Sequence, residues 1–165
     1  MRRERHVFQG RGCLIYPDGT REWLFDGEWV DNILCDEGEK SIIDVYFRAQ
    51  TNPSKYLMLI DDTVDETDTI ATVTESETPG TDGYNRQQVN SGDWAAAALD
   101  AGDYQSEAAP KTFGPNSGSA WSVQNIGVVT VSTGTSGLLI AAMDTGSLTV
   151  PTSIGLQWTT RAKVR

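Results

Sequence analysis

Histidine and cysteine are scarce in this sequence of 165 residues. The single histidine, His6, excludes a histidine-based metal site by number alone. Cys13 and Cys35 are the two cysteines, and neither belongs to a Cys-x-x-Cys pair, so the chain has no disulfide framework. A single disulfide between them stays open as an alternative, but two buried thiols are the favoured state.

Basic side chains are also few, with 13 Lys and Arg against 23 Asp and Glu and a formal net charge of -10. Nucleic-acid affinity comes mainly from cations that displace condensed counterions, so we expect no nucleic-acid partner. No apolar run approaches the length that a bilayer requires, and no apolar segment follows the charged N-terminus as in a secretory signal. We therefore expect no membrane partner and synthesis in a cytoplasm.

The motifs of common enzymes are missing. The sequence contains no Gly-x-x-x-x-Gly-Lys phosphate loop, no Gly-x-Gly-x-x-Gly and no Gly-x-Ser-x-Gly. Its paired carboxylates, Glu75 with Glu77 and Asp93 with Asp103, resemble ordinary surface acids. We expect no catalytic residues, no cofactor and no enzymatic activity.

The acidic segment Asp61–Asp68 could supply oxygen ligands to calcium. It fails the EF-hand template, because Glu66 stands where a sharp turn needs glycine and Thr72 where a bidentate Glu is needed. A solvated acidic loop is the favoured interpretation and calcium the minority one, so we predict no metal site.

Short apolar or β-branched segments separated by Gly, Pro, Asp and Asn dominate the chain. The run Tyr56–Ile60 is continuous and short, which predicts a strand buried on both faces. The alanine run in 94–99 is the only helical candidate, with an extended loop as the alternative. Further strands are predicted at 14–16, 22–25, 43–48, 69–75, 84–89, 120–123, 126–132, 138–143 and 154–158.

This spacing predicts an all-β fold, an antiparallel β-sandwich of jelly-roll type with an extended N-terminal arm and at most one short helix. Residues 1–12 form the expected arm. Residues 13–165 form one β-sandwich domain, hairpin-rich in 13–50 and with its β core in 51–160, and the length suits a single hydrophobic core.

Tryptophans are numerous for a chain of this size. Trp94 falls in a loop-like region and is a candidate exposed contact, because exposed Trp on a β-sandwich can stack on sugar rings; a simple loop anchor is the alternative. Trp23 and Trp29 lie near predicted turns, where rigid aromatic rings serve as interface contacts as often as core.

The strand and turn pattern resembles that of small virion proteins of tailed bacteriophages, in particular capsid decoration (cement) proteins. The resemblance covers about residues 53–160. It is carried by the segments Lys55–Ile60, Thr69–Glu75, Gly83–Gln87, Ile126–Ala142 and Val150–Trp158.

The resemblance implies a noncatalytic protein on the outer capsid surface of a virion that clamps neighbouring capsid subunits. Its expected partners are the major capsid protein and itself, as a homotrimer. Arg3, Arg5, Phe8 and Arg11 of the arm are the candidate contacts with the shell or a neighbouring copy, and the two turn tryptophans join them.

Two alternatives belong to other functional classes. One is a glycan- or receptor-binding module of a phage fibre. The other is a head–tail or tail accessory protein.

Overall fold

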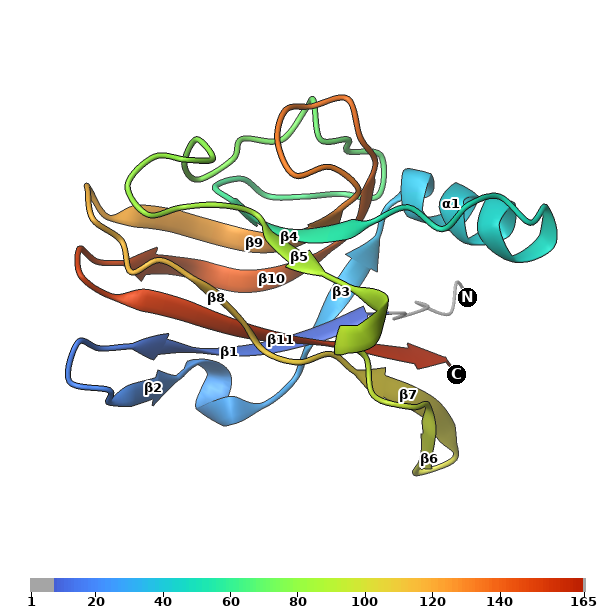
Figure 1. The fold of residues 1–165 in the computed structure, drawn as a ribbon, viewed down its shortest axis with the longest axis horizontal. Coiled ribbons are helices and arrows are strands. Elements are labelled where there is room, and N and C mark those ends of the chain that lie inside the picture. The colour runs from blue at the N-terminus through green and yellow to red at the C-terminus, as the bar shows by residue number, and fades with distance from the viewer. Residues whose placement is uncertain (1–7, 165) are drawn as a thin grey trace.

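The structure, a computed structural model, describes residues 8–164 and is built mainly from antiparallel strands (Figure 1). One path of paired strands runs in the order β5-β4-β9-β10-β3-β1-β11-β7-β6, with β2 paired to β1 and β8 to β11. The strands are β1 (Phe8–Ile15), β2 (Arg21–Trp23), β3 (Val30–Leu34), β4 (Lys55–Ile60), β5 (Gln87–Val89), β6 (Ala98–Asp100), β7 (Asp103–Glu107), β8 (Lys111–Phe113), β9 (Trp121–Val129), β10 (Leu139–Val150) and β11 (Gly155–Val164); the helices are α1 (Asp36–Phe47) and the 3-10 turns η1 (Leu24–Gly27) and η2 (Ser91–Asp93).

Strand β3 joins two halves of this sheet. Its first residues pair with β1 and its last with β10. The halves share one hydrophobic core, to which Leu14 and Trp158 contribute from one half and Leu57 and Val128 from the other. The all-β, antiparallel prediction is confirmed; the jelly-roll type stays a prediction.

Strand β4 is buried on both faces, as its apolar run predicted. Leu57 and Leu59 point into the core between the halves, whereas Met58 and Ile60 belong to a second core on the outer side. Cys35 lies in this second core, and both cysteines are buried free thiols, the favoured alternative.

The only α-helix among residues 8–164 is α1, and it includes 43–47 of the segment 43–48, where the prediction of a strand was wrong. Three acids in its first turn suit the positive end of the helix dipole. Asp44 pairs with both Lys40 and Arg48, each four residues away. These local interactions favour the helix, although alternate residues of 43–48 also fit the two-residue period of a strand.

The helix predicted in 94–99 is wrong as well. Trp94 pairs with Ala108, the amide of Ala95 donates to the carbonyl oxygen of Glu107 at 2.9 Å, and β6 continues the pairing with β7. Cross-strand pairing therefore overrides the helix propensity of alanine. The strand predicted at 69–75 is a series of turns, of which only Glu75 pairs with β4.

The remaining predicted strands lie in the observed ones. Those expected at 14–16, 22–25, 84–89, 120–123, 126–132, 138–143 and 154–158 overlap β1, β2, β5, β9, β10 and β11, most of them with shifted ends. Polar turns with Gly, Pro and Asp account for this success, because they mark where strands end.

The first residues of β1 form a strand where the sequence predicted the second part of an extended arm. Residues 8–12 pair along β11, starting with Phe8 opposite Ala162, and the arm residues 1–7 lie outside the described part. Gly10 and Gly12 make room for the buried ring of Trp158: a Cβ atom added at either would lie 2.2 or 2.4 Å from the nearest ring atom.

Replacing Gly10 with alanine should lower the free energy of unfolding by about 1–3 kcal/mol, since the new methyl group meets a ring with no space to move. Urea denaturation measures this change. Gly92→Ala is the matched control, because nothing lies within 4 Å of a Cβ added there, and it should change stability by less than about 0.5 kcal/mol. Equal stability of the two variants would contradict the packing argument.

Candidate functional site

The N-terminal part of helix α1 is attached to the sheet. The amide of Cys35 donates to the carbonyl oxygen of Ile140 at 3.1 Å, and that of Asp36 to Glu66 at 2.7 Å. A Cβ added to Gly38 would lie 2.1 Å from the Ile140 oxygen, so this turn touches β10 directly. The rest of the helix projects past the end of the sheet (Figure 1).

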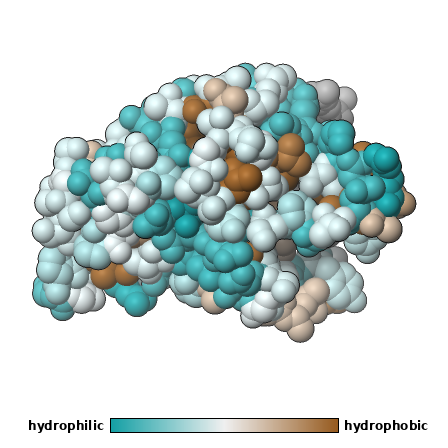
Figure 2. All heavy atoms as spheres, turned by 45° about the horizontal axis from the view of Figure 1, so that its top comes forward, coloured by the Kyte–Doolittle hydropathy of each residue, from teal (hydrophilic) through white to brown (hydrophobic). Residues whose placement is uncertain are grey.

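The projecting part carries a set of exposed apolar side chains, which we call the α1 stripe: Ile42, Ile43, Tyr46 and Phe47. Their exposed fractions are 39, 53, 82 and 79%. The i, i+4 spacing places Ile42 beside Tyr46 and Ile43 beside Phe47. Hydrophobic residues reach the surface at this end of the molecule (Figure 2). Such clustered apolar exposure is typical of an interaction surface.

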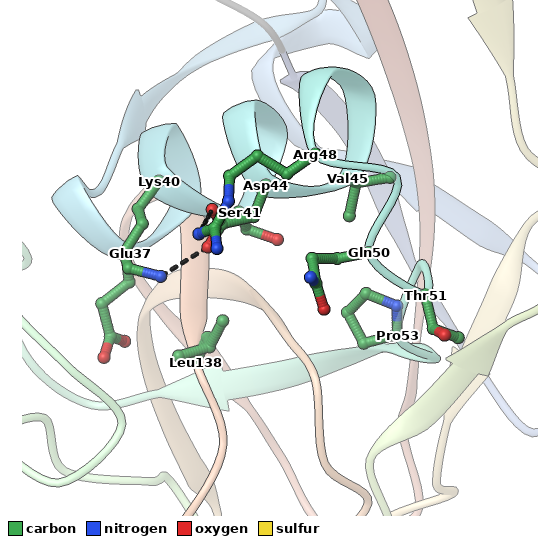
Figure 3. A pocket seen from close by; sticks show the side chains of 10 residues that line it. All are labelled: Glu37, Lys40, Ser41, Asp44, Val45, Arg48, Gln50, Thr51, Pro53 and Leu138. Atoms are coloured by element: carbon green, nitrogen blue, oxygen red, sulfur yellow. Dashed lines mark hydrogen bonds and ion pairs between the residues drawn. The ribbon is translucent and has the colours of Figure 1, made fainter.

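The polar side of α1 faces a cleft of about 580 Å³ between the helix, Pro53 and Leu138 (Figure 3). Hydrogen bonds from Lys40 and Arg48 lower the pKa of Asp44 below its ordinary value. This carboxylate is thus ionised and paired at neutral pH, and is unsuited to accept or deliver a proton in a reaction. The cleft is a solvated, charged helix face.

Residues 8–164 contain neither a cluster of metal ligands nor a helix that could span a membrane. No group of three or more His, Cys, Asp or Glu in this part of the chain could hold a metal ion. In the acidic loop, Asp65 accepts hydrogen bonds from the amide and hydroxyl of Thr67, both at 2.7 Å, so its carboxylate organises a turn. None of the described helices is long and apolar enough to cross a membrane.

The structure brings together two of the predicted contact residues, Arg11 and Trp29. The guanidinium groups of Arg11 and Arg161 lie 4.6 and 4.1 Å from the centre of the Trp29 ring, which is cation–π distance. Arg161 was missed, because only the pairing of β1 with β11 places it here.

The other predicted contacts are dispersed. Phe8 is buried in the core between the sheet halves, and its contact with the shell or a neighbouring copy stays a prediction. Trp23 is exposed on β2, and Trp94 is half-buried at the start of the β6–β7 hairpin. Arg3 and Arg5 lie outside the described residues.

The α1 stripe was not predicted from the sequence. The signal that could have found it is the i, i+4 spacing of Ile42 with Tyr46 and of Ile43 with Phe47.

A buried polar cluster of Glu75, Tyr84 and Arg86 lies under the loops of the outer core. Arg86 donates to both carboxylate oxygens of Glu75, at 2.8 and 2.7 Å, and to the carbonyl of Val131 at 3.1 Å. The Tyr84 hydroxyl donates to Glu75 at 2.6 Å and accepts from the Leu59 amide at 3.1 Å. Burial raises the pKa of Tyr84, so the phenol stays protonated. Each of these three side chains has its hydrogen-bond partners within the protein, which indicates a structural role for the cluster.

Comparison with known proteins identifies the family. A family model described as Podophage GP4 fiber I protein gp80 matches residues 34–154. The chain belongs to this family. The match to the fiber I family starts at the last residue of β3 and ends before β11, so it includes α1 and β10. No curated protein matches the sequence.

Membership of the fiber I family makes the chain a phage virion structural protein. This confirms the resemblance to phage virion proteins at that level, and not specifically to capsid decoration proteins.

Replacing Arg86 with Met should destabilise the fold by about 3–5 kcal/mol, since it leaves the Glu75 carboxylate without its buried partner. The free energy of unfolding in urea is the measurement. Lys40→Met removes a comparable pair on the exposed face of α1 and should cost less than about 1 kcal/mol. A cost at Arg86 no larger than that at Lys40 would show that the buried cluster is dispensable.

Proposed function

We propose that this protein is a noncatalytic structural subunit of a podophage fibre, and that it attaches to a neighbouring virion protein through the α1 stripe. The observation that carries the proposal is the exposure of Tyr46 and Phe47, at 82 and 79%, on a helix that projects from the body. The fiber I family match supports the location in the virion.

The chemistry of the α1 stripe suits protein–protein contact. Fully burying an Ile or Phe side chain stabilises a complex by about 1.5–3 kcal/mol before the costs of association. Aromatic side chains at the centre of an interface often dominate its affinity. Because the stripe faces away from the sheet, a partner can cover it without rearranging the core.

The carboxylates with shifted pKa values support a noncatalytic role. Hydrogen bonds, in two cases from lysine or arginine, lower the pKa values of Asp18, Asp44, Asp65 and Asp93. A general acid or base that works near neutral pH needs the opposite shift.

A capsid decoration role remains the second candidate, because the resemblance of the central strands to cement proteins still favours it. In that role the stripe contacts the major capsid protein. A homotrimer fits either role, since it could pack three stripes together, and sedimentation of the purified chain tests it.

Incorporation into phage particles tests the attachment. The double substitution Tyr46→Ser and Phe47→Ser should reduce the amount of this protein in purified particles by about tenfold or more, equivalent to about 1.4 kcal/mol of lost contact. The matched control is Leu99→Ser with Tyr104→Ser, an exposed apolar pair on the β6–β7 hairpin, which should incorporate normally. Equal incorporation of both variants would exclude the stripe as the attachment surface.

The position of the label distinguishes the two candidates. In electron micrographs of particles with a labelled chain, label confined to fibres supports the fibre role. Label at many sites over the shell supports decoration.

A further inference from the structure

A groove of about 540 Å³ opens on the molecule, and none of the four α1 stripe residues lines it. It lies between the start of β4, the end of β5 with η2, and β7. Phe8 and Val89 supply apolar surface, and Trp94 lines the groove while half-buried. The groove therefore offers the Trp94 ring at a partly solvated surface.

The polar side chains around this apolar surface are amides and hydroxyls. Among the twelve lining residues there is no Asp or Glu, in a chain whose net charge is -10. The side chains of Ser54, Gln88 and Ser91 make no hydrogen bond within the described part of the chain. Each can both donate and accept, which suits a ligand rich in hydroxyl groups.

Lys55 is the one charged side chain in the groove. Its ammonium group donates to the Pro53 carbonyl oxygen at 3.3 Å and to the side-chain oxygen of Asn52, and it pairs with no carboxylate within residues 8–164. Burial lowers its pKa, because desolvation disfavours the charged form. An anionic group entering the groove would give this ammonium a charged partner that residues 8–164 do not supply.

We propose that the groove binds a saccharide that carries a carboxylate, with the sugar ring against Trp94 and the carboxylate on Lys55. A pyranose has an apolar C–H face that stacks on an indole ring and a rim of hydroxyls that amide and hydroxyl side chains bind. A densely charged polyanion fits poorly, because a single lysine faces it and the protein is strongly acidic.

Matched sugars test this site by NMR. Methyl glucuronide and methyl galacturonide are titrated into the 15N-labelled protein beside methyl glucoside and methyl galactoside, which lack only the carboxylate. We expect at least one acidic sugar to shift the Trp94 indole and Gln88 resonances saturably, and its neutral partner to bind about tenfold more weakly. High salt should weaken the binding of the acidic sugar and leave the binding of its neutral partner unchanged.

Variants assign the binding to the proposed residues. Lys55→Met should reduce affinity for the acidic sugar to that of the neutral one, and Trp94→Ala should abolish both, while Trp94→Phe should retain part of the affinity. Lys40→Met and Trp23→Phe, outside the groove, are the controls and should bind like the wild type. Unchanged thermal melting shows that each variant is folded.

Three results would overturn the proposal: no saturable shift with any of the four sugars, equal binding within each pair, or unaltered binding by Lys55→Met. None of them bears on the α1 stripe, since particle incorporation does not depend on the groove. Failure of the saccharide site and failure of the fibre role are thus separate outcomes.

Discussion

The buried ion pair between Arg86 and Glu75 fixes the part of the structure that has least secondary structure of its own. Residues 61–86 contain no strand or helix, yet they cover the outer face of β4, β9 and β10. The ion pair ties this segment to β4, because Tyr84 shares Glu75 and bonds the Leu59 amide. The amide of Asp36 bonds to this same segment, so the base of α1 also depends on it.

The sequence predicts those strands that are determined by residues close together in the chain. The apolar run Tyr56–Ile60 predicts a strand that the structure contains. The strands predicted at 14–16 and 22–25 overlap β1 and β2, which pair with each other. Prediction fails where two periods coincide or where a distant partner decides. Residues 43–48 fit both a strand and the end of a helix. Of the alanines in 94–99, Ala98 lies in a strand, because it pairs with Gln105 of β7.

The candidate sites are less predictable, because they join residues far apart in the chain. Trp94 was a predicted contact, but Lys55 meets it only when β4 and the β6–β7 hairpin come to the same groove. Residues 1–12 were expected to form an arm, and the position of Trp158 on β11 explains why residues 10 and 12 are glycines. Arg11 lies against the Trp29 ring, and the second arginine on that ring, Arg161, is placed there by the strand register.

The pairing of β1 with β11 has a mechanical consequence. Phe8, at the start of the described chain, lies opposite Ala162, near its end. Hydrogen bonds of an antiparallel pair run perpendicular to the strands, so tension applied between these two ends would peel the strands apart one bond at a time. The domain therefore resists little force applied between the start of β1 and the end of β11. A virion would load it more safely through surfaces away from these two ends.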